Sequence, residues 1–330
     1  MDLRFAPDAF PSGRRYSITP FAEKGTHQIY NLKVIYEFFI ETLYFLSITF
    51  CKRGGTMSNK YKLTIPMAIV ITLIAIVYQR TTGPTYPKKF KINYQGEKVR
   101  VKLPRSQENT EGALISLPLL DKSHQLTVFY KRFPTNDEWS ESPLEMKASV
   151  WEFRLPVQPA AGKLQYYIEM KDQEGNMIQS LGNAPSPILI RYKGPVSAFI
   201  LAPHIFCMFF AMLLSALAGS EALFKTEASR HVGRWALGFL FVGGMILGPL
   251  VQKSAFGVYW AGFPFDWDLT DNKLLIGFLA WLIAVIANAK AKRPKFTLAA
   301  AIVLIGMYSI PHSTMGSQYN YEEGKVVTDR

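Results

Sequence analysis

The chain has 330 residues and a net charge of +12, with hydrophobic residues at 49% and aromatic residues at 14%. A strongly basic protein can be one that binds nucleic acid. Here, however, much of the basic excess stands at the ends of apolar stretches, where membrane proteins carry Lys and Arg. The composition therefore favours a membrane protein whose partners include the lipid bilayer, and it excludes nucleic acid as a partner.

Residues 1–56 precede an internal methionine, Met57, from which the sequence reads like a complete membrane protein with a normal start. Within them, the stretch 34–50 is apolar but includes Glu37 and Glu41. One interpretation is an N-terminal extension that is not native, and we then expect it to be dispensable. The alternatives for the apolar stretch are an amphipathic helix at the membrane interface or a spanning helix, which two carboxylates inside the bilayer disfavour.

Five apolar stretches follow and predict membrane-spanning helices. The first has a basic start and no A-x-A-like cleavage site, which indicates an uncleaved anchor helix at 57–80 rather than a signal peptide. The other four predict a transmembrane four-helix bundle at 195–312, in which Gly244 and Gly248 form a G-x-x-x-G pair that favours close helix contact. The five stretches are residues 63–78, 196–218, 235–251, 274–289 and 296–311.

Two basic turns set the orientation of these helices. The stronger is the K-A-K-R-P-K turn at 290–295, and the other, after residue 218, holds Lys225, Arg230 and Arg234. Two membrane crossings separate the turns, so both lie on the same side of the membrane. The positive-inside rule makes that side the cytoplasmic one.

The same orientation places three polar segments outside the cytoplasm: the segment 81–194, the loop 252–273 and the C-terminal tail 313–330. We therefore expect a multi-pass protein of the bacterial cytoplasmic (inner) membrane, with an extracytoplasmic domain and C-terminus. The two cysteines, Cys51 and Cys207, lie outside 81–194, so this domain must rely on its own core rather than on disulfides.

Within 81–194, short stretches alternate apolar and polar residues in the manner of β-strands, and Gly, Pro, Asn and Asp clusters separate them. The stretches are KFKINYQ, KVRVKL, ALISLPL, LTVFYKRF, ASVWEFRLP, KLQYYIEMKD and PILIRYK. Seven short strands in about 110 residues suit an antiparallel β-sandwich. The expected fold class is thus a membrane α-helical bundle of five transmembrane helices with an inserted all-β sandwich.

The most specific part of this domain is the stretch VWEFRLPVQPAAGKLQYYIEMKDQEGN, residues 150–176. It resembles the end of immunoglobulin-like or fibronectin-type-III-like domains of bacterial surface proteins. In those, a strand ending in Leu-Pro leads to a Gly turn, a Tyr-Tyr-Ile strand and an Asp-x-x-Gly-Asn hairpin. The resemblance implies an immunoglobulin-like sandwich, with Trp151 and Tyr167 as core and corner residues, but no activity, because such sandwiches host many functions. The matching residues are Leu155, Pro156, Gly162, Tyr166, Tyr167, Ile168, Asp172, Gly175 and Asn176.

Two histidines of the apolar part follow a proline, His204 in A-P-H-I-F and His312 in I-P-H-S-T. The predicted orientation places them at similar depth on the outer side of the membrane. Ionisable groups inside a membrane are functional candidates, and two histidines can ligate a haem b iron. With Cys207 and Met208 nearby they would instead suit copper, which soft sulfur ligands favour. The alternative is that His204 hydrogen-bonds within the bundle and His312 caps the interface.

The outer loop SAFGVYWAGFPFDWDLTDNK, residues 254–273, combines aromatic residues with three aspartates. One interpretation is an aromatic belt at the membrane interface, with Asp271 as the N-cap of the fourth helix. The other is a lid over a site that includes His204 and His312. The loop and tail resemble segments of bacterial membrane proteins of unassigned activity, so the resemblance implies no reaction.

The sequence carries no Walker A loop, nucleophile elbow, H-E-x-x-H motif or zinc-ligand spacing, so no catalytic residue is assigned. No charged residue lies inside the five apolar stretches, which disfavours a proton-driven transporter. We expect a non-enzymatic anchor or assembly protein that presents its β-sandwich to other membrane or extracytoplasmic proteins. The alternative is a redox or metal-handling protein with a haem or copper site at the outer leaflet.

Overall fold

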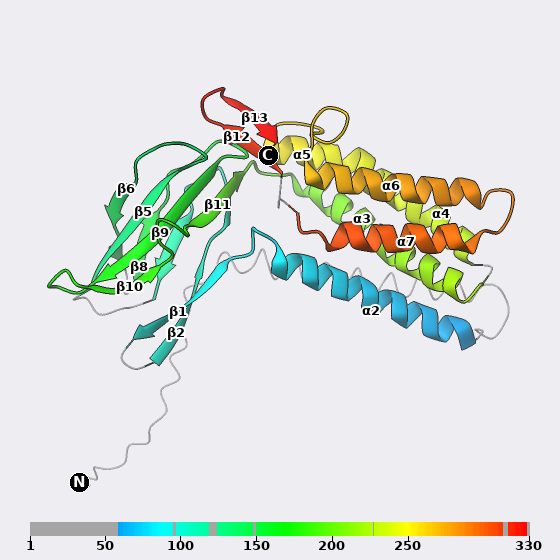
Figure 1. Cartoon of the computed structure of the whole chain (residues 1–330), viewed down its shortest axis with the longest axis horizontal. Coiled ribbons are helices and arrows are strands. Elements are labelled where there is room, and N and C mark those ends of the chain that lie inside the picture. Colours follow the sequence, from blue (N-terminus) through cyan, green and yellow to red (C-terminus); the bar gives the residue numbers. More distant parts are fainter. Residues whose placement is uncertain are drawn as a thin grey trace, which may run out of the picture. The chain divides into compact units, whose positions relative to one another are not determined.

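A computed structural model of the chain (Figure 1) describes residues 59–330, except for 95–96, 119–123, 148–149, 227, 313–315 and 329–330. The predicted extension at 1–56, with its apolar stretch, lies outside the described residues. From Lys62 to Arg330 the chain forms one compact unit.

Strands form where apolar and polar residues alternate, and each of the seven predicted strands is present. They are β1 (Lys88–Tyr94), β2 (Glu97–Leu103), β4 (Leu114–Leu117), β5 (Gln125–Phe133), β8 (Val150–Arg154), β9 (Lys163–Lys171) and β11 (Ile188–Lys193). Four shorter strands join them: β3 (Ser106–Glu108), β6 (Ser140–Pro143), β7 (Glu145–Lys147) and β10 (Met177–Leu181). Residues 88–193 therefore form a β-sheet-rich domain.

The described strands of this domain form a large sheet, a small sheet and a hairpin. The large sheet has the order β3-β11-β9-β5-β6, with β10 also paired to β9, and the small sheet has the order β4-β8-β7. β1 and β2 pair with each other. The pairing is antiparallel except between β3 and β11, where Ser106 lies opposite Arg191 in a parallel ladder. Parallel neighbours need a long crossover, and the chain between β3 and β11 supplies it, so the all-antiparallel expectation does not hold at this edge.

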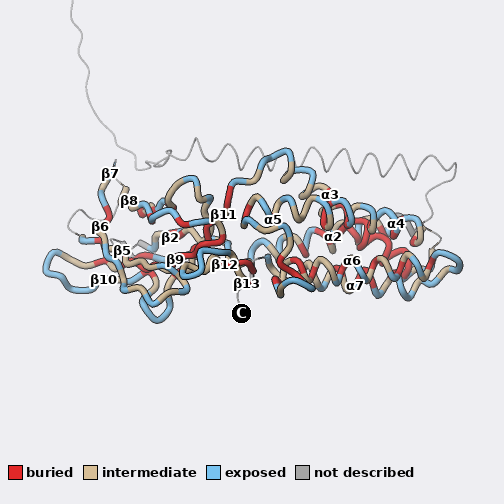
Figure 2. The backbone as a smooth tube through the Cα atoms, turned by 90° about the horizontal axis from the view of Figure 1, so that it is seen from above, coloured by how far each residue is buried: buried red, intermediate tan, exposed pale blue. Residues whose placement is uncertain are grey.

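One hydrophobic core joins the sheets. Alternate residues of β9 point inward, because successive side chains of a strand face opposite sides, and Tyr166 and Ile168 are buried there against Ile115 of β4 and Val101 of β2. The hydroxyl of Tyr166 donates to the carbonyl of Pro104 at 2.8 Å. Trp151, expected inside, packs against this core as a half-buried residue instead. Figure 2 shows the buried parts of β9 and β11.

Outside this domain the described chain contains five apolar helices, and four of them are long and apolar enough to cross a membrane, which indicates a membrane protein. These four are α2 (Asn59–Thr82), α3 (Ala198–Leu223), the helix composed of α4 (Ser229–Leu240), the π-helical segment η1 (Phe241–Leu247) and α5 (Gly248–Phe256), and α6 (Leu269–Ala287).

The fifth helix, α7 (Pro294–Ser309), corrects the prediction of five transmembrane helices. It has 16 residues, which span about 24 Å against a hydrocarbon core of about 30 Å. Pro294, which belongs to the basic turn, is the first residue of the helix, and the helix ends just before Ile310. Ile310 precedes Pro311, and a residue before proline is disfavoured in a helix.

Close packing inside the bundle depends on small side chains. A Cβ atom at Gly244 in η1 would lie 2.5 Å from Cδ1 of Leu274 in α6, so the two helices pack closely at this glycine. Trp281 of α6 is fully buried, and its indole N–H donates to the hydroxyl of Ser215 in α3 at 3.1 Å. The predicted close helix contact is therefore present at Gly244.

Helix α2 buries a narrow stripe and exposes the rest of its surface. The stripe consists of small residues that recur at helical spacing, and its members are Thr64, Ala68, Thr72 and Ala75. Val70 and Ile74 are 54% and 63% exposed. Large apolar side chains on the outside of a long apolar helix are the pattern expected for contact with lipid.

We call the end of the bundle next to the β-sheet domain, where α5 ends and α6 begins, the domain end. The opposite end, where α3 and α6 end, is the far end (Figure 1).

Candidate functional site

The C-terminal residues fold back onto the β-sheet domain as a hairpin. Its strands are β12 (Ser317–Asn320) and β13 (Lys325–Thr328), which lie between the other strands and the helices in Figures 1 and 2. Gly324 in the turn has a φ of 65°, a conformation that glycine adopts without steric cost. The N–H of Tyr319 donates to the carbonyl of Ala161, just before β9, at 3.1 Å. Residues 317–328, within the segment predicted only as a tail, thus form part of the fold.

Buried polar side chains fix this hairpin to β9. Lys163, at the start of β9, is 2% exposed, and its ammonium group donates to Oε1 of Gln318 at 2.6 Å. The hydroxyl of Tyr321 donates to Oε1 of Gln158 at 2.8 Å. Burial raises the pKa of Tyr321 to about 12, so its hydroxyl stays a donor at neutral pH. A buried polar group that loses its partner is costly, which makes the hairpin an obligatory part of this surface.

The other side of the hairpin is held by Asp268 at the start of α6. Its Oδ2 accepts from the N–H and the hydroxyl of Ser317 at 2.8 and 3.1 Å, and its Oδ1 accepts from the N–H of Thr270 at 2.7 Å. Asp268 is 2% exposed. One carboxylate therefore caps α6 and binds β12. We call the contacts of Lys163, Asp268, Ser317, Gln318 and Tyr321 the clamp.

The sheet and the bundle also touch directly. The N–H of Gly194, directly after β11, donates to the carbonyl of Ala255 in α5 at 2.8 Å. The guanidinium carbon of Arg191 lies 5.7 Å from the ring centroid of Phe256. With the clamp, these contacts make the β-sheet domain part of one unit with the bundle rather than a domain on a free linker.

The start of α6 corrects the predicted cap. Asp268 is the N-cap, because α6 begins at Leu269, earlier than the apolar stretch suggested. Asp271 instead accepts from the N–H of Ala261 at 2.6 Å and from the side-chain amide of Gln252 at 3.2 Å. It therefore ties the loop between α5 and α6 to the end of α5.

That loop exposes its aromatic side chains. Tyr259, Phe263, Phe265 and Trp267 are 56%, 55%, 81% and 65% exposed. The loop joins two helices that are apolar enough to span a membrane, so exposed rings at this level suit an aromatic belt. Among the described residues, no ring contact or hydrogen bond joins these four side chains to a histidine, and the interpretation as a lid gains no support.

Three of the predicted ligands gather at one point on α3. His204 Nδ1 lies 2.9 Å from the carbonyl oxygen of Gly243 in η1. A Cβ atom on Gly243 would lie 2.6 Å from Cβ of Cys207 and 3.0 Å from Sδ of Met208, so both border the same glycine. A carbonyl can only accept, so Nδ1 of His204 donates and Nε2 keeps its lone pair. This is the tautomer that metal-binding histidines adopt, although it equally satisfies a histidine inside a bundle.

The fourth predicted ligand, His312, has a different partner. The ammonium group of Lys273 lies 2.9 Å from His312 Nδ1 and 2.6 Å from the carbonyl oxygen of Ile310. An ammonium group only donates, so Nδ1 accepts and a neutral His312 carries its proton on Nε2. Neither nitrogen then offers a free lone pair to a metal.

No group of three or more His, Cys, Asp and Glu side chains suited to a metal ion occurs in the part of the chain that the structure describes. His204 fits a ligand role by its tautomer, whereas His312 does not fit one while Lys273 donates to it. Ligation of one haem iron by both histidines, and copper binding by Cys207 and Met208, stay predictions.

In the part of the chain whose burial is described, three charged side chains are buried within the helices, although the apolar stretches themselves contain none. Asp271 and Lys273 are 6% and 5% exposed at the domain end, and Glu221 is 1% exposed at the far end. The hydroxyls of Thr64 and Thr226 donate to the carboxylate of Glu221. The helices extend beyond the apolar stretches by about one turn, so the argument against a proton-driven transporter loses this support.

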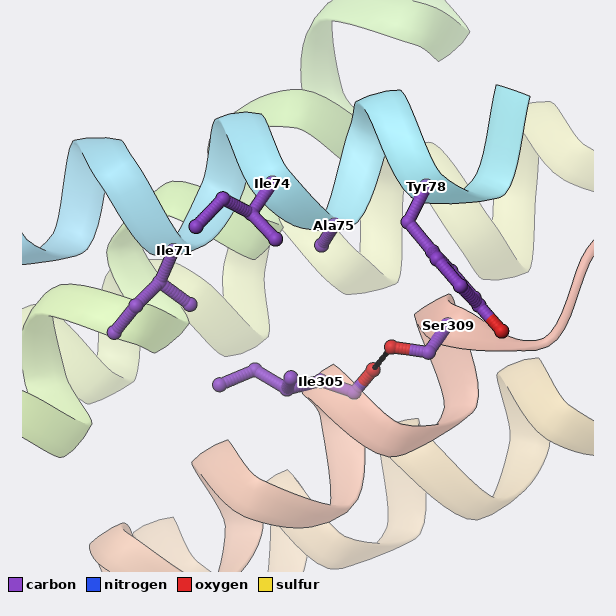
Figure 3. Close-up of a pocket in the computed structure, with 6 residues that line it drawn as sticks. All are labelled: Ile71, Ile74, Ala75, Tyr78, Ile305 and Ser309. Atoms are coloured by element: carbon purple, nitrogen blue, oxygen red, sulfur yellow. Dashed lines mark hydrogen bonds between the residues drawn. The ribbon is translucent and has the colours of Figure 1, made fainter. Parts of the chain in front are cut away.

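A shallow groove lies between α2 and α7 (Figure 3). Its volume is about 360 Å³, and its lining residues are Ile71, Ile74, Ala75, Tyr78, Ile305 and Ser309. The hydroxyl of Ser309 donates to the carbonyl of Ile305 at 2.8 Å and is thus already satisfied. An apolar groove between two apolar helices suits a lipid chain. The hydroxyl of Ser309 is already hydrogen-bonded, so it offers a polar ligand little to bind.

The sequence matches no protein-family model and no curated protein. The geometry of the described residues therefore carries the functional argument, and its most distinctive feature is the clamp.

Proposed function

We propose that this chain is a non-enzymatic membrane anchor that holds a β-sandwich of the immunoglobulin-like type in a fixed position outside the cytoplasm, for binding a protein partner. The charge asymmetry of the turns supports this orientation, because the 290–295 turn at the far end is strongly basic. The resemblance of residues 150–176 to immunoglobulin-like domains, and the shared core of the two sheets, support the sandwich.

The clamp is the observation that carries this proposal. A domain that only needs to be tethered can hang on a flexible linker, since relative motion is the default between domains with small polar interfaces. Here the chain places Lys163 and Asp268 in buried positions and returns its C-terminus to hold them. Burying charged groups costs free energy unless they are well bonded. A chain that buries them between the domain and the helices therefore favours one fixed orientation of the domain.

Distances between spin labels test the fixed orientation. In a chain with both native cysteines replaced, labels at Thr110→Cys in the domain and Ala291→Cys at the far end should give one narrow distance distribution in lipid nanodiscs. Adding Asp268→Ala should broaden it, and the conservative control Val327→Ile should not. A broad distance distribution in the protein with an unaltered clamp would show that the domain moves on a tether and would refute the proposal.

The same two cysteines test the orientation. An impermeant maleimide added to intact cells should label position 110 and not position 291, as the positive-inside rule requires. Labelling only at position 291 would reverse the topology and remove the extracytoplasmic role.

A second candidate, metal or haem binding at the outer leaflet, rests on the tautomer of His204 and on the positions of Cys207 and Met208 around Gly243. Titration of the purified protein with Cu(I) or with haem b would show it. Saturable binding that is lost in His204→Ala favours this function, and equal binding in that variant removes it.

A further inference from the structure

One face of the large sheet points away from the hydrophobic core. On β5 this face carries Phe129 and Phe133, and on β9 it carries Lys163 and Tyr167, which alternate with the core residues of the same strands. The ladder between β5 and β9 places Phe133 opposite Lys163 and Phe129 opposite Tyr167. The two pairs therefore lie at two levels of one surface.

The level at Phe133 and Lys163 is covered by the clamp, and aromatic rings there are paired with the chain's own cations. The ammonium nitrogen of Lys163 lies 5.7 Å from the ring centroid of Phe133. The guanidinium carbon of Arg132 lies 5.1 Å from the ring centroid of Tyr321 in the hairpin. Cations over aromatic rings at these distances are attracted by the negative face of the ring. The covered part of this surface therefore already contains cation–π contacts.

The level at Phe129 and Tyr167 has aromatic rings like those of the covered level. The two rings are stacked with centroids 4.8 Å apart, and Trp139 meets Tyr167 edge-on with centroids 5.0 Å apart. Lys131 reaches the far part of the cluster, with its ammonium nitrogen 5.1 Å from the Trp139 centroid. Among the described residues, no cation lies over Phe129 or Tyr167, and no group bonds the hydroxyl of Tyr167, which is 8% exposed.

The segment that carries Trp139 is acidic. The segment 134–146 has four acidic residues and no basic residue, in a chain whose net charge is +12. Asp137 pairs with Arg132, and Glu145 pairs with Lys147. Glu138 and Glu141 are exposed and form no ion pair within the described part of the chain, and Glu141 lies opposite Phe129 in the ladder between β5 and β6.

The carboxylates act on Tyr167 itself. Its pKa is raised, first by burial and then by the nearby charges of Glu169 and Glu141. Glu169 also pairs with Lys171 at 3.3 Å, so Glu141 and its neighbour Glu138 supply the free negative charge at this level. Aromatic faces bordered by carboxylates attract a cation both through the rings and through the charges.

We infer that the surface formed by Phe129, Trp139, Tyr167, Glu138 and Glu141 binds a Lys- or Arg-bearing segment of a protein partner. This inference rests on the proposed function, because it names the surface that the fixed domain presents. The partner's cation would lie against the half-buried rings of Phe129 and Trp139, beside the carboxylates, and Tyr167 would support these rings from beneath. This contact would repeat at the open level the pairing that Lys163 and Arg132 make at the covered level. The backbone beside it is the last strand of the large sheet, β6, so an extended segment can lie along this edge.

An octalysine peptide with a fluorescent label is the probe, and the full-length protein in nanodiscs of uncharged lipid is the target. Fluorescence anisotropy should show saturable binding that weakens as salt is added. The double variant Glu138→Gln/Glu141→Gln should weaken binding about tenfold, and Trp139→Ala about fivefold. The matched control Glu174→Gln, an exposed acidic residue in the turn between β9 and β10, should bind like the parent protein.

An octapeptide of acetyl-lysine, which lacks the charges, should not bind. Equal binding of both peptides would show a neutral ligand surface and overturn the inference, as would equal losses in Glu174→Gln and in the double variant. Trp139→Phe, which keeps an aromatic face, should retain more affinity than Trp139→Ala if the ring contributes. A protein with a narrow spin-label distribution that ignores octalysine refutes this inference alone, whereas a broad distribution refutes the proposed function.

Discussion

The two levels of the outward face of the large sheet are built from the same two strands, yet they are used differently. At one level the C-terminal hairpin covers Phe133 and Lys163 and buries the lysine. At the other level the rings of Phe129 and Trp139 are half-buried, pack on the buried Tyr167 and lie beside exposed carboxylates. The chain supplies its own partner at the first level, and the inferred binding surface assigns the second level to another molecule. It predicts that substitutions at the covered level lower stability, whereas substitutions at the open level lower binding.

The largest expected effect on stability is that of Asp268→Ala, because this carboxylate caps α6 and holds Ser317 of the hairpin. Loss of the cap and of the buried contacts should lower the free energy of unfolding by roughly 2–4 kcal/mol. Ser317→Ala removes only the hydroxyl contact and should cost about 0.5–1.5 kcal/mol. Equilibrium unfolding in detergent measures both, and equal values for the two variants would contradict the double role of Asp268.

The next largest effect separates the two levels directly. Gln318→Leu removes one acceptor of the buried Lys163 ammonium group and should cost roughly 1–3 kcal/mol. Glu141→Gln at the open level changes an exposed residue and should change stability by no more than about 0.5 kcal/mol. The same unfolding measurement compares them. A stability loss in Glu141→Gln as large as that in Gln318→Leu would show that both levels are structural.

The strands of the domain could be predicted from the sequence because each strand has its own alternation of apolar and polar residues. The alternation in K-L-Q-Y-Y-I-E-M-K marks β9, and its core-facing residues Leu164, Tyr166, Ile168 and Met170 are buried as it predicts. Lys163 and Tyr167, on the other face, are buried as well, which the alternation does not predict. The helices could be located in the same way, but their ends could not, since α6 begins five residues before the apolar stretch at 274–289 and thereby includes Asp271 and Lys273. Charged residues that are buried by tertiary contacts look like solvated helix ends in a sequence.

The clamp could not be predicted for the same reason. Lys163 at the start of a strand reads as an exposed residue, and its partner Gln318 lies 155 positions away. The hairpin itself left a weak signal, because S-Q-Y-N and K-V-V-T flank a turn that contains Gly324. Four-residue strands are too short to be distinguished from a tail by alternation alone. His312 likewise could not be assigned, since its contact with Lys273 depends on where two helices meet.

The smallest expected effect concerns the link between the two levels. Arg132 lies over Tyr321 of the hairpin and also bonds both carboxylate oxygens of Asp137, at 2.7 and 3.0 Å. Hydrogen bonds from Arg132 lower the pKa of Asp137 below its ordinary value of 3.8. A carboxylate with a lowered folded-state pKa adds stability above the unfolded pKa and loses it as the pH falls through the folded value. The contribution of this pair should therefore be complete at neutral pH and vanish only below about pH 4.

The Arg132→Leu variant tests this link, and Asp137 itself is the reporter. Its carboxyl carbon, followed by NMR during an acid titration, should titrate at a higher pH in the variant than in the parent protein. The stability change should be smaller than that of Gln318→Leu, because the side chains of Arg132 and Asp137 are 48% and 30% exposed and water screens such pairs. Octalysine binding should change little, since Asp137 becomes free but Glu138 and Glu141 are unaltered. An unchanged titration of Asp137 would show that the pair does not persist in solution, and the covered level would then depend on the clamp alone.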